Sequence, residues 1–132
     1  MERKKLKRTD LIYPDLCYYL VGILFEVYNE IGSGYHEKYY QRAIGEVFKK
    51  CRIPFREQVL VPLKFRGSKI GKYFLDFVVD DKIVLEVKRG EGFARANINQ
   101  IYCYLKAVNL KLGILINFTN KGLKFKRIVN LV

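Results

Sequence analysis

Three ionisable side chains stand in otherwise apolar segments near the middle of the sequence. Asp76 interrupts the segment 73–79, and ten residues later Glu86 and Lys88 interrupt the segment 83–88. Charged groups in buried segments cost several kcal/mol unless they are paired or bound to a cation. Two carboxylates can hold a hard divalent cation, and a nearby ammonium can stabilise a transition state that gains negative charge. These residue types therefore point to metal-assisted hydrolysis of a phosphate ester.

The segment 83–88 has the composition of a buried β-strand, in which side chains alternate between the two faces. Glu86 and Lys88 then share one face and lie about 7 Å apart. The alternative for these two residues is an ion pair within the strand, with Asp76 solvated at a sheet edge. Asp76 decides between the two interpretations, because a second carboxylate beside Glu86 favours a cation site.

The connection between the two segments decides whether the carboxylates meet. A loop of three residues, 80–82, pairs Val79 with Ile83 and places Asp76 opposite Glu86. A two-residue loop shifts the register by one and places the carboxylates on opposite faces of the sheet. We expect the three-residue loop.

The elements that position these residues follow from periodicity. Apolar residues at helical spacing predict a helix over 14–31, ended by Gly32-Ser33-Gly34, and a second helix over 36–51. Val- and Leu-rich runs predict three strands, followed by a helix, a strand buried on both faces and a short final element. The three strands are expected over 58–65, 72–79 and 83–88, the helix over 93–108 and the buried strand over 112–118. The final element follows the basic residues 121–127. This order predicts an α/β fold with a mixed central sheet flanked by helices.

Length and charge bound the class of protein. The chain has 132 residues, which suits one domain over 13–132 preceded by a flexible basic N-terminal arm, residues 1–12. A formal net charge of +12 sets up a field that attracts polyanions, so nucleic acid is the expected partner. The candidate phosphate contacts are Arg3, Lys4, Lys5, Lys7, Arg8, Arg89, Arg95, Lys121, Lys124, Lys126 and Arg127.

Other function classes are disfavoured by what the sequence lacks. Cys17, Cys51 and Cys103 have no metal-binding spacing and lie in apolar helical contexts, which predicts reduced core residues. No apolar run approaches the length of a membrane span, and no signal-peptide core follows the basic start. We expect an intracellular protein without a membrane partner.

Two further groups of residues could complete a site. Glu37 lies at the start of the second helix, where the helix dipole favours a carboxylate whether or not the residue has a function. Gln100 and Tyr104 are one helical turn apart, so they could hold a phosphate or orient the acidic pair, or Tyr104 could simply pack on the sheet. His36, the single histidine, is expected to be a capping or surface residue.

The spacing Gly34-x-x-Glu37-x-x-Tyr40 resembles the signature of the GxxExxY proteins, a family of the PD-(D/E)xK nuclease superfamily. The resemblance extends over roughly residues 15–130 and includes Gln100-x-x-x-Tyr104 and the strand Leu115-Ile116-Asn117-Phe118. The proline that gives the superfamily its name is replaced here by Leu75.

This resemblance implies a restriction-endonuclease-like αβββαβ core. It also implies Asp76, Glu86 and Glu37 as metal ligands, Lys88 as the catalytic lysine, and Gln100, Tyr104 and Tyr40 as substrate-positioning residues.

The expected function is a Mg²⁺- or Mn²⁺-dependent nuclease that hydrolyses phosphodiester bonds of DNA. A homodimer is a further expectation, because one small domain spans little duplex. A non-catalytic nucleic-acid-binding protein with the same fold is the main alternative. An interaction protein whose basic surface binds an acidic protein or an RNA scaffold is a third.

Overall fold

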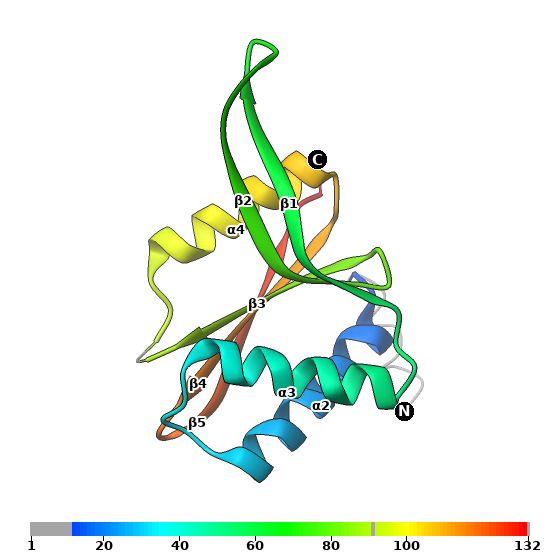
Figure 1. Cartoon of the computed structure of the whole chain (residues 1–132), viewed down its shortest axis with the longest axis vertical. Coiled ribbons are helices and arrows are strands. Elements are labelled where there is room, and N and C mark those ends of the chain that lie inside the picture. The colour runs from blue at the N-terminus through cyan, green and yellow to red at the C-terminus, as the bar shows by residue number, and fades with distance from the viewer. Residues whose placement is uncertain (1–11, 91, 132) are drawn as a thin grey trace, which may run out of the picture.

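A computed structural model of the chain describes residues 12–90 and 92–131 (Figure 1). The N-terminal arm proposed from the sequence lies, up to residue 11, outside the described residues. The elements are α2 (Pro14–Ile31), α3 (Glu37–Lys50), β1 (Phe55–Phe65), β2 (Ser68–Val79), β3 (Ile83–Arg89), α4 (Arg95–Val108), β4 (Leu112–Thr119) and β5 (Gly122–Val129). Their types and order confirm the α/β prediction, with one addition: the final element is a full strand.

The strands form one mixed sheet in the order β1-β2-β3-β4-β5. β3 and β4 run parallel and are connected through α4, whereas every other pair is antiparallel. A parallel pair needs a crossover of this kind, because its two strands start at the same edge of the sheet. β4 is buried along its whole length, as its apolar composition predicts.

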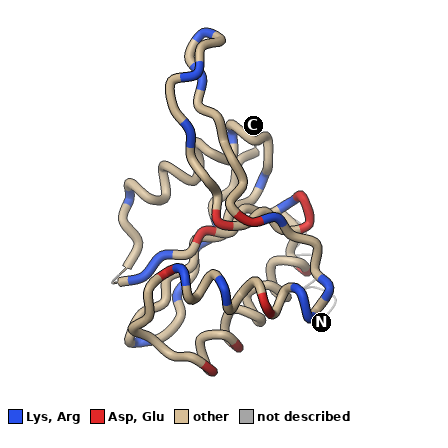
Figure 2. Tube along the Cα trace, in the orientation of Figure 1, with Lys and Arg blue, Asp and Glu red and all other residues tan. Residues whose placement is uncertain are grey.

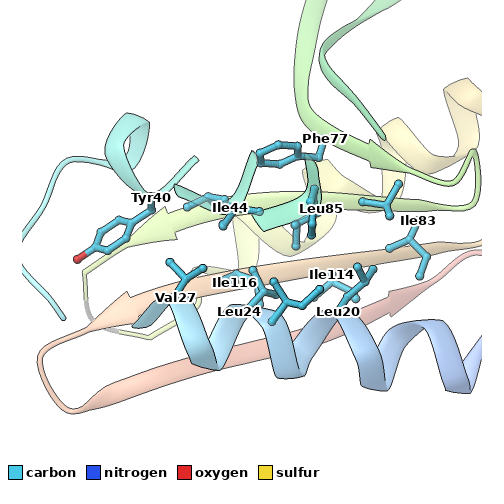
Figure 3. Packing of buried hydrophobic residues seen from close by; sticks show 14 of the residues in the cluster. Leu20, Leu24, Val27, Tyr40, Ile44, Phe77, Ile83, Leu85, Ile114 and Ile116 are labelled. Carbon is cyan, nitrogen blue, oxygen red and sulfur yellow. The ribbon is translucent and has the colours of Figure 1, made fainter. Parts of the chain in front are cut away.

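Helices α2 and α3 cover one face of the sheet. Leu20 and Leu24 of α2 and Ile44 of α3 are completely buried against the alternate apolar residues of β3 and β4, among them Leu85 and Ile114 (Figure 3). Each buried aliphatic or aromatic side chain contributes about 1.5–3 kcal/mol relative to exposure. This layer contains the larger of the two core clusters.

Helix α4 covers the other face and lies very close to β4. A Cβ atom added at Gly113 would approach Cγ2 of Ile101 to 2.8 Å, so only glycine lets the helix come this near. Ile101, Tyr104 and Leu105 pack from α4 onto Val84 and other residues of this second core cluster.

Several boundaries and burial states differ from the predictions. β1 and β2 are longer than expected, so the turn between them shrinks to Arg66-Gly67, both with positive φ. Cys17 is buried as predicted, but Cys51 and Cys103 are exposed. The prediction failed for Cys51 because the helix ends one residue before it, and for Cys103 because it lies on the exposed side of α4.

The outer parts of β1 and β2 form a two-stranded ribbon, residues 58–75, that projects beyond the rest of the molecule (Figure 1). Gln58 has φ 50 and, like Asp76 opposite it, is missing from the ladder between β1 and β2. On the β3 side of this point Phe77 packs in the cluster that α2 and α3 cover. On the ribbon side Leu75 packs in the cluster that α4 covers. The two strands thus change the face they bury at Gln58 and Asp76.

Candidate active site at the fork between β2 and β3

The register between β2 and β3 is the one that the three-residue loop predicts. Val79 pairs with Ile83 and Phe77 with Leu85, after which the regular ladder ends and β2 diverges from β3. Continued by one residue, the register sets Asp76 opposite Glu86. The two carboxylates therefore lie at a fork in the sheet.

Side chains replace backbone pairing at this fork. The backbone N–H of Asp76 donates to Oε2 of Glu86 at 2.6 Å, and the backbone N–H of Val87 donates to Oδ2 of Asp76 at 2.8 Å. Each carboxylate thus accepts from the opposite strand. The exchange ties both side chains to the backbone and fixes their orientation.

Both carboxyl groups hold their protons unusually tightly. Burial raises the pKa of Asp76 from 3.8 to about 6, against the hydrogen bond from Val87. Burial, followed by repulsion from Asp76, raises the pKa of Glu86 from 4.5 to about 7. Among the residues that the structure describes, no salt bridge involves either group. Burial thus disfavours the ionised form of both groups, and no cationic side chain of the described residues forms a salt bridge that would offset this.

Lys88 and Glu37 lie close enough to act on this pair. Burial dominates the pKa of Asp76, but the charge of Lys88 lowers that pKa and the charge of Glu37 raises it. Lys88 follows Glu86 on the same face of β3, and Glu37 is the first residue of α3. A third carboxylate and an ammonium, from α3 and β3, therefore lie near enough to the pair for their charges to act on it.

Tyr40 fixes the loop that leads to Glu37. Its ring is completely buried and stacked on Phe118, with centroids 3.9 Å apart. Its hydroxyl donates to the carbonyl of Gly32 at 2.8 Å and accepts the N–H of Tyr35 at 3.2 Å. In the described structure Tyr40 is thus a core residue that holds the loop before Glu37, and its side chain is not open to a substrate.

Tyr73 belongs to the site although no pattern in the sequence singles it out. Its hydroxyl donates to Oε1 of Glu86 at 3.0 Å, and its ring stacks on Tyr104 with centroids 4.1 Å apart. Burial and the neighbouring Glu86 raise the pKa of Tyr73 well above its usual value, so the hydroxyl keeps its proton.

Tyr104 and Gln100 therefore reach the site indirectly. Burial raises the pKa of Tyr104 and the charge of Glu86 raises it further, while hydrogen bonding by Gln100 lowers it. Tyr104 is buried and Gln100 is exposed. Gln100, Tyr104, Tyr73 and Glu86 form a continuous series of contacts from α4 to the carboxylate pair.

A row of polar side chains crosses the sheet beside Lys88. Lys88 pairs in register with Asn117 of β4, which pairs with Lys124 of β5. Asn117 is buried, its side-chain amide donates to the carbonyl of Gly92, and its Oδ1 has no hydrogen-bond partner in the described part of the chain. In the neighbouring row Glu86 pairs with Leu115 of β4, which pairs with Lys126 of β5. The site face thus carries positive charge as far as the β5 edge.

The other basic candidates are distributed differently. Arg127 alternates to the opposite face from Lys126 and donates to the carbonyl of Ile12 at 2.8 Å. Arg89 donates to the carbonyl of Tyr35 at 3.0 Å, which attaches β3 to the loop before α3. Arg95 at the start of α4 and Lys121 before β5 are exposed. The structure therefore does not gather all of these residues on one surface.

The donor set suits a hard divalent cation. Asp76 and Glu86 offer carboxylate oxygens, the ligands that Mg²⁺ and Mn²⁺ prefer, and a cation would offset their mutual repulsion. Within residues 12–90 and 92–131 no three Asp, Glu, His or Cys side chains come together as one metal-holding group. The fit therefore rests on two carboxylates, with Glu37 near them.

The described residues contain no helix both long and apolar enough to cross a bilayer.

Comparison with known proteins gives a family and a fold. The model of the PD-(D/E)XK nuclease superfamily matches residues 14–128 of the chain. A search of curated proteins finds no match.

Two solved structures are similar to this chain. The crystal structure of SSO0001 superposes with a TM-score of 0.56 at 18% identity, over 72% of this chain and 50% of that one. An alkaline exonuclease (LHK-Exo) from Laribacter hongkongensis superposes with a TM-score of 0.53 at 10% identity, over 86% of this chain and 68% of that one. This chain spans half the length of SSO0001. Both likenesses support a restriction-endonuclease-like fold.

Proposed function

Because this chain belongs to the PD-(D/E)XK nuclease superfamily, we propose that it is a divalent-metal-dependent nuclease that hydrolyses phosphodiester bonds of DNA. The observation that carries the proposal is the fork between β2 and β3. There, the half-buried carboxylate of Asp76 and the buried carboxylate of Glu86, without a salt-bridge partner in the described structure, lie beside Lys88. The GxxExxY spacing of Gly34, Glu37 and Tyr40 makes that family the proposed subgroup.

Asp76 and Glu86 would hold the cation, and Glu37 would approach it from α3. When bound, Mg²⁺ or Mn²⁺ supplies a Lewis acid that polarises the scissile phosphate and acidifies water. The raised pKa values of Asp76 and Glu86 support this assignment, because a cation favours the ionised form that burial disfavours.

Lys88 would act directly on the reacting groups. Its ammonium lies close enough to lower the pKa of both carboxyl groups, so it can stabilise charge that develops on the phosphate and orient the attacking water. In hydrolysis the oxygen of water would form a bond to phosphorus and release a proton to solvent. The bond from phosphorus to one ester oxygen would break, and that leaving oxygen would take up a proton.

The surrounding residues would orient the carboxylates and the substrate. Tyr73 holds Glu86 by a hydrogen bond, and Tyr104 supports Tyr73 by stacking. Gln100 is exposed at the outer end of this series and could contact a phosphate. Tyr40 would act only through the loop that it fixes before Glu37.

Plasmid nicking tests the proposal. Supercoiled DNA is incubated with the protein and Mg²⁺ or Mn²⁺, and we expect nicked or linear product that EDTA abolishes. Lys88→Ala should reduce the rate by about 10² to 10³, as loss of a charge-stabilising group does. Lys82→Ala is the matched control: it removes a lysine at the other end of the same hairpin, where an exposed pair with Asp80 contributes little.

Two outcomes would overturn this proposal. Cleavage that survives both Lys88→Ala and Asp76→Ala would mean a contaminant or another site. Salt-sensitive binding of DNA without cleavage in either metal would instead support the non-catalytic binding protein. Light scattering in the same buffer tests the expected homodimer.

A further inference from the structure

The ribbon, residues 58–75, carries positive charge without compensation. It contains four basic side chains and no Asp or Glu: Lys64, Arg66, Lys69 and Lys72. Figure 2 shows these blue segments along the projecting hairpin, with acidic residues appearing only at its base. A surface of this composition is complementary to a polyanion.

The two faces of the ribbon differ sharply. Val61 and Leu75 on the inner face are buried in the cluster that α4 covers. On the outer face Leu60 and Phe74 form a cross-strand pair, yet they remain 46% and 45% exposed. The same face carries the cross-strand pair Lys64 and Lys69. Nothing in the described chain covers this outer face.

The tip of the ribbon is also apolar and basic together. Phe65 and Ile70 are 59% and 68% exposed, and the guanidinium of Arg66 lies 5.1 Å from the ring centre of Phe65. Single exposed apolar residues are ordinary, but four of them interleaved with four basic residues on one projection are typical of an interaction surface. Apolar side chains can contact thymine methyl groups, whereas basic ones contact phosphates.

The ribbon begins at the candidate active site. Asp76, which exchanges hydrogen bonds with β3, is the residue of β2 directly before which the ribbon ends. From Asp76 to Lys69 the strand extends about 23 Å, the rise of about seven base pairs. A substrate whose scissile phosphate lies at Asp76 could therefore contact the ribbon over most of one helical turn.

We propose that the ribbon enters the major groove of the DNA duplex on one side of the scissile phosphate, and so makes duplex DNA the substrate class. The placement of the scissile phosphate rests on the proposed function, but groove binding does not. The major groove of B-DNA, about 12 Å wide, admits a two-stranded ribbon, whereas the deep and narrow major groove of A-form RNA does not. The ribbon therefore selects duplex DNA over duplex RNA by shape.

Binding in EDTA tests the inference apart from cleavage. Fluorescence anisotropy measures the Kd for a 20-base-pair DNA duplex and for an RNA duplex of the same sequence, over a series of salt concentrations. The ribbon variant is Lys64→Ser with Lys69→Ser. Its matched control is Lys49→Ser with Lys50→Ser, which removes the same charge from exposed positions at the end of α3.

We expect the wild-type protein to bind DNA at least about tenfold more tightly than RNA. The ribbon variant should lose about 10- to 100-fold in DNA affinity. The slope of log Kd against log salt should fall by about 2, because each of the two lysines neutralises one phosphate in the wild-type complex. The control variant should change DNA affinity by less than about threefold. In a dimethyl sulfate footprint, guanine N7 atoms, which lie in the major groove, should be protected by the wild-type protein and not by the ribbon variant.

Equal loss of affinity in the ribbon and control variants would overturn the inference, because the effect would then be one of net charge. Equal affinity for DNA and RNA, or a footprint without N7 protection, would also overturn it. Preference for an acidic protein over DNA would assign the ribbon to another partner and would do the same. Cleavage by the wild-type protein together with any of these results would leave the proposed function standing, whereas ribbon-dependent DNA binding without cleavage would remove only the proposed function.

Discussion

The two halves of β2 are continuous in sequence but differ in nearly every physical respect. Phe77 and Val79 pair with strands on both sides and are completely buried. The half from Ser68 to Leu75 pairs only with β1 and leaves one face open to solvent. Asp76 stands between the halves. The inner half contributes to folding, and we assign recognition to the outer half and the chemistry to the point where one changes into the other.

The largest expected effect is on cleavage at that boundary. Asp76→Asn keeps an oxygen that accepts the N–H of Val87 but removes the negative charge, so cleavage of DNA should fall by at least about 10³-fold. The rate of plasmid nicking under saturating metal measures this. A loss below tenfold would mean that Asp76 belongs to the structural half of the strand after all.

A pair of phenylalanines three residues apart tests the difference between the halves. Phe77→Ala removes a completely buried ring and should lower the free energy of unfolding by about 3 to 5 kcal/mol. Phe74→Ala removes a half-exposed ring from the ribbon and should lower it by less than about 1 kcal/mol while weakening DNA binding. Urea denaturation and anisotropy measure the two quantities. Similar destabilisation by both substitutions would erase the distinction.

The ionised carboxylate pair should lower the free energy of unfolding of the metal-free protein. The pKa of Asp76 rises from 3.8 to about 6 on folding, so the folded state binds the proton more tightly and loses stability as pH increases through this interval. The free energy of unfolding of Asp76→Asn should therefore exceed that of the wild type by about 3 kcal/mol above pH 7, and the difference should disappear near pH 4.

Urea denaturation in EDTA at both pH values provides the measurement. Added Mn²⁺ should stabilise the wild type and have little effect on the variant. A variant less stable than the wild type at pH 8 would contradict the assignment of unrelieved charge at this site.

The smallest expected effect sharpens the role of Tyr73. Tyr73→Phe removes a hydrogen bond that favours ionised Glu86, with a loss of about 1 kcal/mol. The pKa of Glu86 should increase further. The pH at which the affinity for Mn²⁺ reaches half of its maximum should therefore increase as well. Titration calorimetry over a pH series measures the shift. An affinity that falls equally at every pH would indicate a packing role only.

Much of the fold was predictable because its signals are local. Helical spacing ended by Gly32 defined α2, and the apolar run beginning at Leu112 defined β4. The three-residue loop after Val79 fixed the register and so placed Asp76 opposite Glu86. The nuclease superfamily was recognised by resemblance, through short motifs such as Glu86-x-Lys88, and the match of the family model confirms it.

The remainder of the site depends on the local twist of β1 and β2 and on tertiary contacts, which no short sequence pattern predicts. Alternation along β2 puts Tyr73 on the opposite side from Asp76, yet its hydroxyl reaches Glu86. The left-handed backbone at Gln58 and the gap in the ladder opposite it account for this. A positive φ is uncommon for glutamine, so the residue type does not predict it. Asn117 likewise meets the backbone of Gly92 only through the tertiary fold.

The turn at Arg66-Gly67 has a consequence for how such a protein can diversify. Both residues adopt positive φ, as the tight turns that suit twisted hairpins require, and neither belongs to a core cluster. Loop tips of this kind tolerate insertions and deletions. Lineages can therefore lengthen, shorten or recharge the hairpin while the sheet and the fork between β2 and β3 stay unchanged.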